Sequence, residues 1–180
     1  MSRRAKIALA ALVALGAVLL GVGLWGVTHQ SASSAAPTEQ SLIPTFQGGP
    51  APAIVGTTLD GRPFDLKDLA GTPVVLNFWA SWCGPCRREL PAIAAFAKAH
   101  PEVQVIGVDY QDSAKAARAF ATQHGATWPS VIDDGPIGAA YKVPGLPSTF
   151  LIDRQGQLVG RLLGEVTEQS LDARLKDLTA

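Results

Sequence analysis

The sequence predicts an α/β domain with a mixed central sheet and helices on both faces, preceded by one long apolar segment. A nearly continuous apolar run over residues 74–79 has the pattern of a central strand buried on both sides. Strand-like and helix-like stretches alternate after it and end in a hairpin and a helix. A Cys-x-x-Cys pair follows the apolar run directly, which places reactive groups where the strand turns into a helix.

The first half of this domain predicts a hairpin, a strand and a helix. Residues 53–59 are extended in pattern, and Asp60-Gly61 is a strong turn signal before Arg62-Pro63-Phe64. After the central strand, helical periodicity runs from about residue 86 to 100, with Pro91 expected to bend the helix. An N-terminal hairpin therefore precedes the strand and helix that carry the cysteines.

The second half predicts alternating elements that complete the sheet. Residues 103–108 are a second buried strand, and Ser113 caps a helix that runs to His124, with Gly125 at its end. A short helix is expected over 137–141. Two antiparallel strands over 148–153 and 158–163 and an amphipathic helix over 167–178 follow.

The N-terminal segment predicts export. Residues 1–6 form a basic tail, and residues 7–27 carry no charge, which is long enough to cross a bilayer as a helix. The basic tail should stay in the cytoplasm, so residues 28–50, a flexible linker, and the domain at 51–180 lie outside. An uncleaved anchor is favoured over a cleaved signal, although Ser34-Ala35-Ala36 has the composition of a cleavage site.

Charge and cysteine content exclude some functions. Three of the chain's 15 basic residues lie in the tail, so the rest of the chain has 12 basic residues against 15 acidic ones. The domain is therefore mildly acidic, and nucleic acid is not an expected partner. The only two cysteines are three positions apart, where a disulfide closes almost no loop. A zinc site would need further Cys or His ligands, and none lies close in sequence. The pair is therefore chemical rather than structural.

The expected chemistry is thiol–disulfide exchange. Unpaired N–H groups at a helix N-terminus stabilise a thiolate, so Cys83 should be the nucleophile and Cys86 should resolve the mixed disulfide. Gly84-Pro85 holds the turn between the sulfurs, and Trp82 gives an apolar flank on the exposed side. A lone Cys-x-x-Cys is otherwise incidental spacing or half of a metal site. The strand context and export favour the redox interpretation.

Residues 79–86, Trp-Ala-Ser-Trp-Cys-Gly-Pro-Cys, resemble the active site of thioredoxin, and residues 143–153 resemble its cis-proline segment. With Pro52-Ala53 and residues 71–79, the match is closest to the TlpA-type branch of exported thioredoxin-like reductases, which includes ResA and CcmG (DsbE). The resemblance implies a thioredoxin-like fold and a cis Leu146-Pro147 bond beside the cysteines. It also implies that the Leu146 backbone pairs with an extended substrate.

Several positions around the site depart from thioredoxin or have more than one interpretation. Asn77 stands where thioredoxin has a buried aspartate, and asparagine cannot accept a proton. The resemblance implies that an acid after the next strand serves instead, with Asp112 the best match and Asp109 the fallback. An exposed acid near a helix start explains Asp112 equally well. Glu89 matches the branch's Cys-Arg-x-Glu-Leu-Pro pattern, although a surface helix acid accounts for it equally well.

The resemblance implies a reductant of exported Cys-pair proteins such as apocytochrome c, recharged by a membrane electron donor. Its only redox group is the Cys83–Cys86 disulfide, with no further cofactor and no metal. A disulfide-forming oxidase of the same fold is an alternative. From another class, a Cu(I)-binding carrier would use the two thiolates, although His100 and His124 are expected at helix ends away from them. A thiol peroxidase is disfavoured because Ala80 occupies the position of its Thr or Ser.

Overall fold

A computed structural model of the chain describes residues 48–179. The apolar segment at 7–27, the basic tail and all but the last residues of the expected linker lie outside this range. Within residues 48–179, no helix is both long enough and apolar enough to cross a bilayer.

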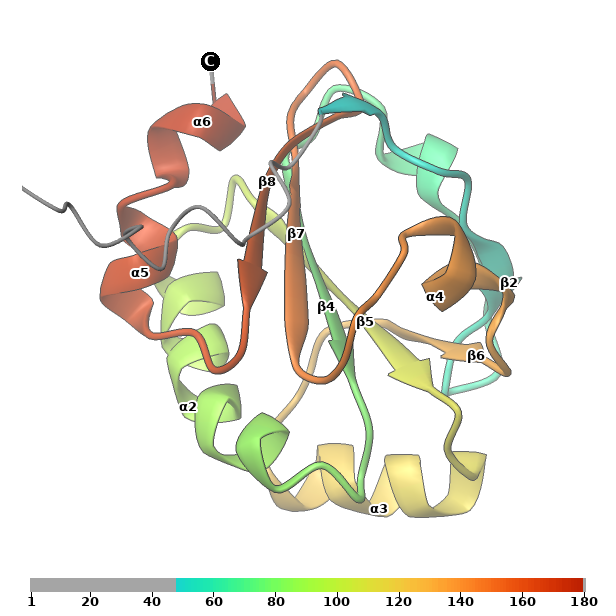
Figure 1. The fold of residues 1–180 in the computed structure, drawn as a ribbon. Helices are drawn as coiled ribbons and strands as arrows, with labels where there is room; N and C mark the ends of the chain where they lie inside the picture. Colours follow the sequence, from blue (N-terminus) through green and yellow to red (C-terminus); the bar gives the residue numbers. More distant parts are fainter. Residues whose placement is uncertain (1–47, 180) are drawn as a thin grey trace, which may run out of the picture. The chain divides into compact units, whose positions relative to one another are not determined.

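The described residues form eight strands and several helices in alternation (Figure 1). The strands are β1 (Gly49–Pro50), β2 (Val55–Thr57), β3 (Pro63–Asp65), β4 (Val74–Trp79), β5 (Gln104–Tyr110), β6 (Ser130–Asp133), β7 (Ser148–Ile152) and β8 (Gln157–Leu163). The helices are the 3₁₀ helix η2 (Leu66–Leu69), α2 (Gly84–Ala99), α3 (Ala114–Gln123), α4 (Pro136–Ala140), α5 (Glu168–Asp172) and α6 (Leu175–Thr179).

The six-stranded sheet has the order β1-β8-β7-β4-β5-β6 and is mixed, as predicted. β4, β5 and β6 are parallel, while β7 and β8 run antiparallel to their neighbours. β4 lies between β5 and β7, and all six of its residues are buried. This central position makes β4 the rigid support of the segment that follows it.

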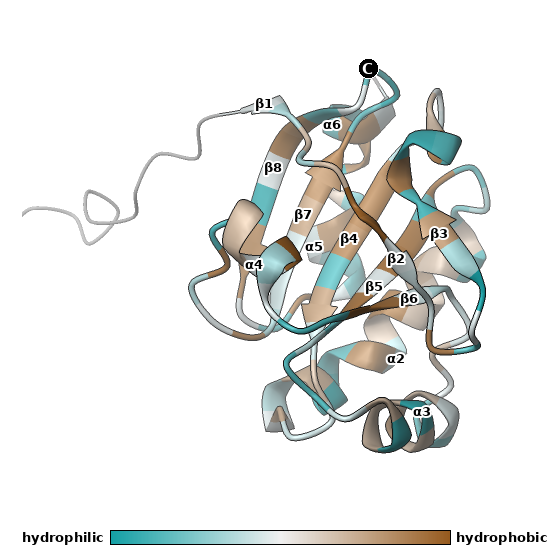
Figure 2. Cartoon of the chain, turned by 90° about the vertical axis from the view of Figure 1, so that its right-hand side faces the viewer, coloured by the Kyte–Doolittle hydropathy of each residue, from teal (hydrophilic) through white to brown (hydrophobic). Residues whose placement is uncertain are grey.

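Helices cover both faces of the sheet, and the two faces differ in what covers them. On one face, α2, α5 and α6 pack on a cluster around Val75, Ile93 and Leu171, and α3 packs beside the cysteines. On the other, α4 and the β2–β3 hairpin cover a cluster around Phe78 and Phe150. Figure 2 shows β4 and β7 as largely hydrophobic ribbons between these layers.

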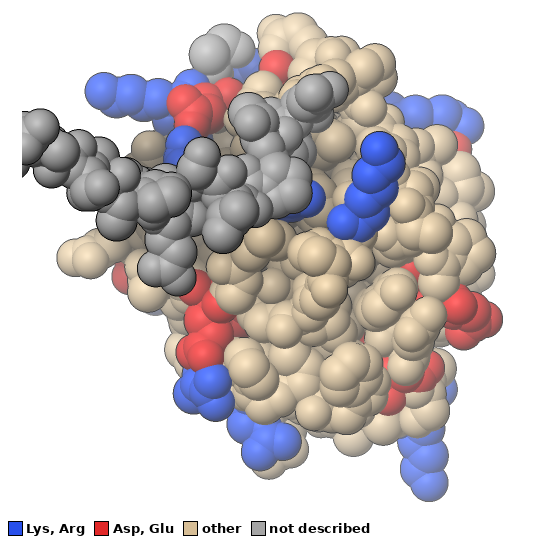
Figure 3. Space-filling model, in the orientation of Figure 1, with Lys and Arg blue, Asp and Glu red and all other residues tan. Residues whose placement is uncertain are grey.

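The charged side chains are dispersed on the face of the molecule that Figure 3 shows. Most lysine and arginine side chains lie near its margin, some of them beside aspartate or glutamate, and a basic side chain also crosses the upper right of a broad uncharged surface. Opposite charges are therefore interspersed on this face.

Most expected elements are confirmed. The hairpin around Asp60-Gly61 is present as β2–β3, and the central strand has the bounds that the apolar run predicted. Ser113 caps α3 by accepting a hydrogen bond from the N–H of Ala116, and Gly125 after the helix has a φ of +69°. The structure contains Pro91 inside α2, which continues past it to Ala99.

Other elements differ from the sequence prediction. β6 was not expected, because it has only four residues between Pro129 and Asp134-Gly135. The last helix is divided into α5 and α6 where the N–H of Arg174 bonds to the carbonyl of Leu171. The sheet also begins at Gly49, two residues before the expected domain boundary, because Gly49 and Pro50 pair with β8.

Candidate active site

The Cys83–Cys86 pair lies where β4 turns into α2. Cys83 is the N-cap of α2, with extended backbone angles, and its Sγ accepts a hydrogen bond from the N–H of Cys86 at 3.1 Å. Pro85 lies in the first turn, where its missing N–H costs no hydrogen bond. The sulfur therefore meets the unpaired N–H groups and the positive end of the helix dipole, which favour a thiolate.

The two cysteines form a disulfide with their Cα atoms 5.3 Å apart. Cys83 keeps 4% of its surface exposed, whereas Cys86 has none. Both belong to a cluster with Trp79, Leu90 and Phe120, which we call the cysteine cluster. Cys83 is therefore the more accessible of the two sulfurs to an incoming thiolate.

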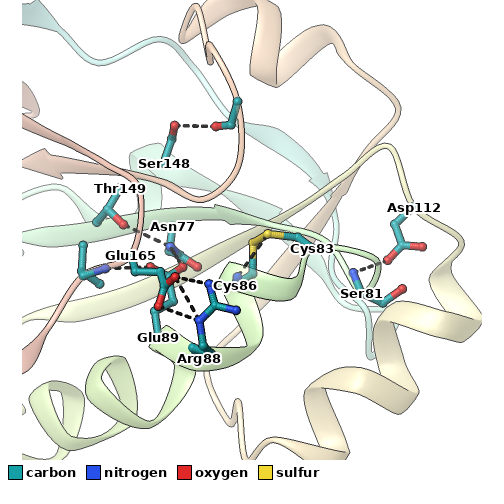
Figure 4. The surroundings of a disulfide bond; sticks show 12 residues. Asn77, Ser81, Cys83, Cys86, Arg88, Glu89, Asp112, Ser148, Thr149 and Glu165 are labelled. Atoms are coloured by element: carbon teal, nitrogen blue, oxygen red, sulfur yellow. Dashed lines mark hydrogen bonds and ion pairs between the residues drawn. A yellow bond between two sulfur atoms is a disulfide. The ribbon is translucent and has the colours of Figure 1, made fainter.

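The loop before Cys83 is held by the segment after β5. The N–H of Ser81 donates to Oδ2 of Asp112 at 2.6 Å (Figure 4). The N–H of Ser113 donates to Oδ1 of the same carboxylate at 2.7 Å. The indole N–H of Trp82 reaches the carbonyl of Gln111 at 3.4 Å, and the Trp82 ring is 62% exposed. Asp112 thus braces the loop, and Trp82 presents an apolar surface beside the disulfide.

The Leu146–Pro147 peptide bond is cis, as the resemblance implied. Leu146 packs against the cysteine cluster, and Ser148 anchors the loop by donating its hydroxyl to the carbonyl of Gly145 at 2.7 Å. The carbonyl of Pro147 accepts the N–H of Gly164 at 3.0 Å. These contacts bring the cis-proline loop and the cysteines to one end of the sheet.

Glu89 is buried, so of the two interpretations of this residue the surface helix acid is wrong. Only 1% of it is exposed. Its Oε1 accepts from Nδ2 of Asn77 at 2.9 Å, and its Oε2 accepts from the N–H of Val166 at 3.1 Å (Figure 4). Burial raises the pKa of Glu89 to about 7 although both hydrogen bonds act to lower it.

Sequence spacing contained a signal for this burial. The buried residues of α2 are Cys86, Glu89, Leu90, Ile93 and Phe96, which follow the three- and four-residue steps of one helix face. Glu89 stands on that face between Cys86 and Ile93. A charged side chain at such a position is easily assigned to the exposed edge of the helix. Its hydrogen-bond partners, Asn77 on β4 and Val166 after β8, cannot be identified from the helix sequence alone.

Asn77 links the buried carboxyl to the sheet. Its Nδ2 also donates to Oγ1 of Thr149 on β7 at 3.1 Å. It therefore occupies the position of the thioredoxin aspartate without supplying a proton acceptor of that strength.

Asp109 lies on β5 and is completely buried. Neither of its carboxylate oxygens has a hydrogen-bond partner within the described residues. Burial, together with the negative charges of Asp112 and Asp134, raises the pKa of Asp109 to about 7. The two acids that the resemblance offered thus differ in kind, since Asp112 is held by backbone N–H groups and Asp109 by none.

Basic residues near the cysteines have partners of their own. The Arg88 guanidinium pairs with the Glu165 carboxylate, with Nε 3.0 Å from both oxygens. The guanidinium of Arg87 lies 5.9 Å from the centre of the Phe120 ring. His100 and His124 cap the C-terminal ends of α2 and α3, as expected.

Known proteins are similar to this chain in sequence and in fold. The family profile described as the AhpC/TSA family matches residues 47–161. The chain belongs to that family. The thiol-disulfide oxidoreductase ResA of Bacillus thuringiensis (strain Al Hakam) is 39% identical over 135 residues, which cover 73% of this chain and 78% of ResA. The chain is therefore a thioredoxin-like thiol–disulfide oxidoreductase.

Solved structures of similar oxidoreductases share the fold of this chain. A putative thiol:disulfide interchange protein DsbE from Chlorobium tepidum is 30% identical with a TM-score of 0.69, and the match covers 74% of this chain and 99% of that one. A secreted Mycobacterium tuberculosis disulfide oxidoreductase, homologous to E. coli DsbE, is 30% identical with a TM-score of 0.64, covering 69% and 96%. The resemblance to the branch of ResA and CcmG (DsbE) is confirmed.

Proposed function

We propose that this oxidoreductase is an extracytoplasmic reductant of exported proteins that carry a cysteine pair, with apocytochrome c as the model substrate. The observation that carries the proposal is the Cys83–Cys86 pair at the N-terminus of α2, with the outer sulfur reachable and the inner one buried. Cys83 in its thiolate form attacks the substrate disulfide. Cys86 then attacks Cys83, which releases the reduced substrate and closes the disulfide.

Other residues of the site position the substrate and the nucleophile. Gly84 and Pro85 begin α2 and hold the two sulfurs at bonding distance. Trp82 and Leu146 offer apolar surface beside Cys83, and the backbone of Leu146 before Pro147 pairs with an extended substrate segment. Asp112 keeps the loop before Cys83 in place.

The proposed location depends on the N-terminal segment. Residues 7–27 anchor the chain in the cytoplasmic membrane, residues 1–6 remain on the cytoplasmic side, and the following linker carries the domain on the outside. The relative from Mycobacterium tuberculosis is described as secreted, which supports this side of the membrane. A membrane electron donor then has to reduce the disulfide after each turnover.

The direction of the reaction is tested by the reduction potential of the full chain in detergent, equilibrated with glutathione or dithiothreitol buffers. A value near thioredoxin's, roughly −270 mV, is expected for a reductant. A value near roughly −120 mV, like that of a strong periplasmic oxidant, would replace this proposal with the disulfide-forming oxidase.

The substrate class is tested with a disulfide-bonded peptide containing Cys-x-x-Cys-His, the haem-attachment motif of c-type cytochromes. The reduced chain should open this disulfide, and Cys83→Ser should abolish the reaction. Cys86→Ser should stop it at a mixed disulfide with Cys83. If Cys83→Ser reduces the peptide as fast as the wild type, the proposed chemistry is wrong.

A Cu(I)-binding carrier is the alternative function from another class of protein, and it can be tested directly. Titration of the reduced chain with Cu(I) against a competing chelator would show tight one-to-one binding if the thiolates serve as ligands. We expect binding too weak to compete, because His100 lies at the far end of α2 from the disulfide and the ring of His124, at the C-terminal end of α3, packs on Phe120.

A further inference from the structure

Two residues other than glycine have a positive φ in the described part of the chain, Gln111 and Lys142, each at +51°. Lys142 follows the last turn of α4, where the N–H of Val143 bonds to the carbonyl of Gly138. A left-handed residue is a common way to end a helix with such a bond. Gln111 ends no helix, since it lies between β5 and α3. The left-handed conformation is unfavourable for a residue with a Cβ atom, so at Gln111 it needs another explanation.

The residues on either side of Gln111 fix its backbone. Before it, Tyr110 is in register with Asp133 of β6, and the N–H of Gln111 continues this pairing by donating to the carbonyl of Asp133 at 2.8 Å. After it, the Asp112 carboxylate accepts the N–H of Ser81 at 2.6 Å. A strained conformation persists only where its surroundings determine it in this way, and such positions are concentrated at functional sites.

The carbonyl of Gln111 points at the candidate active site. It accepts the indole N–H of Trp82, with the nitrogen and oxygen 3.4 Å apart. The Trp82 side chain is 62% exposed, so packing holds it only in part. Because φ is the rotation about the N–Cα bond, a right-handed φ at Gln111 would swing its carbonyl away from the indole while its N–H stays on β6.

This contact uses the backbone of Gln111 and not its side chain. Gln111 is exposed, and its Nε2 lies over Gly135, where an added Cβ would come within 3.2 Å of it. A glycine in place of Gln111 could therefore make the same contact with Trp82, because glycine adopts a positive φ without a steric penalty.

We propose that Gln111 is a positioning residue, whose left-handed backbone aims its carbonyl at the Trp82 indole and so fixes the apolar surface on which protein substrates dock beside Cys83. This inference rests on the proposed reductase function. A side chain that is already ordered loses little rotamer freedom when a substrate covers it, which favours docking. A small disulfide that contacts only the sulfur of Cys83 gains nothing from a fixed Trp82. Gln111 should therefore affect substrate affinity and leave thiol reactivity unchanged.

The test follows one turnover of the reduced full chain, in detergent, with the disulfide-bonded Cys-x-x-Cys-His peptide. Acid quenching and alkylation of the peptide thiols give the limiting rate and the half-saturating peptide concentration. Bis(2-hydroxyethyl) disulfide serves as the small disulfide. Hydrogen exchange of the Trp82 indole N–H, followed by NMR and assigned by the loss of its signal in Trp82→Phe, reports the contact itself.

Gln111→Val should lose this contact, because a β-branched residue disfavours a positive φ. We expect the half-saturating peptide concentration to rise roughly three- to tenfold and the indole N–H to exchange faster. The limiting rate and the reaction with the small disulfide should not change. Gln111→Gly is the matched control and should keep the wild-type values. If Gln111→Val folds poorly, Gln111→Ala applies the same test, since alanine also disfavours a positive φ.

A double-mutant cycle separates this contact from the bond between Asp112 and Ser81. Trp82→Phe keeps a ring but has no N–H to donate. Adding Gln111→Val to Trp82→Phe should change the half-saturating peptide concentration less than about twofold. A change that acted through Asp112 would be as large in this background as in the wild type.

A wild-type half-saturating concentration in Gln111→Val would overturn the inference. Equal losses in Gln111→Gly and Gln111→Val, or an undiminished effect in the Trp82→Phe background, would also overturn it. A wild-type chain that fails to reduce the peptide would instead refute the proposed function. The two failures are therefore distinguishable in one experiment.

Discussion

Glu89 and Asp109 are both buried carboxyl groups on the same side of the sheet, and they differ in what surrounds them. Glu89 has one donor on each oxygen and joins α2 to β4 and to the segment after β8. Asp109 has none within residues 48–179 and joins nothing. Burial raises both pKa values to about 7. Glu89 therefore links three segments of the fold, whereas the Asp109 carboxyl is buried without a hydrogen bond within the described residues.

The largest effect on stability is expected from Asn77→Asp, which removes one of the two hydrogen-bond donors of the Glu89 carboxyl. The donor 2.9 Å from Oε1 of Glu89 becomes a second carboxylate. At pH 8 two buried charges would repel, and the free energy of unfolding should fall by about 3–5 kcal/mol. At pH 5 the pair can share a proton, so the loss should be much smaller. Urea unfolding at both pH values measures the difference.

The control for Asn77→Asp is Thr149→Val, which removes the other partner of Asn77 without adding charge. Its effect should be small and independent of pH. Equal losses for Asn77→Asp at pH 5 and pH 8 would show that the two side chains are not coupled electrostatically.

Asp109→Asn should stabilise the protein at pH 8. The pKa of Asp109 is about 7 in the folded chain, against a usual 3.8, so the folded state holds an extra proton between about pH 4 and 7. Stability from this group is therefore lost as pH rises through that window. Without the carboxyl, the free energy of unfolding at pH 8 should be on the order of 2–4 kcal/mol higher.

Urea unfolding of wild type and Asp109→Asn across pH 4–8 measures this effect. The two curves should converge at pH 4 and separate as pH rises. A constant difference between the two curves would mean that Asp109 is ionised in the folded protein over the whole range from pH 4 to 8. Other interactions would then offset the effect of burial on its pKa.

Asp112→Ala should have a smaller effect, because it removes the acceptor of two backbone N–H groups near the surface. We expect a loss of about 1–2 kcal/mol and faster hydrogen exchange at the Ser81 amide. The charge of Asp112 also raises the pKa of Asp109, so that pKa should fall. Asp112→Asn, which keeps one acceptor oxygen, should preserve more of the loop protection. Unchanged exchange at Ser81 in Asp112→Ala would contradict the bracing role.

The smallest effect is expected from Glu165→Gln. Glu165 is a like charge that raises the pKa of Glu89, and it is paired with Arg88 at the surface. Its removal should lower the pKa of Glu89 slightly and leave thermal stability nearly unchanged, since exposed ion pairs contribute little. A carbon-13 titration of the glutamate carboxyls measures the shift, with Arg88→Ala as the control. A rise in the Glu89 pKa would contradict the expected sign.

Sequence reasoning succeeds where one pattern decides the structure. The apolar run over β4 admits only a strand buried on both faces, and its position before Cys83 locates the site. Asp60-Gly61 and Ser113 act through local turn and cap chemistry, so the β2–β3 hairpin and α3 follow from a few residues.

It fails where contacts between distant segments decide. β6 is too short to show a pattern, and it exists because Val131 and its neighbours pair with β5. Glu89 needs Asn77 and Val166 to be buried, and neither is near it in sequence. Asp112 follows Gln111, whose φ of +51° lies in the left-handed region, and the sequence gives no sign of this backbone conformation.

The short β1–β8 pairing has a consequence for how the enzyme can be handled. Gly49 and Pro50 pair with Leu158 and Gln157, at the end of the sheet where β4 begins, whereas Cys83 follows the other end of β4. A six-residue strand separates these ends by roughly 20 Å. A fusion partner or a solid support joined before Gly49 would thus be attached at the pole remote from the disulfide, leaving the reactive sulfur facing the medium.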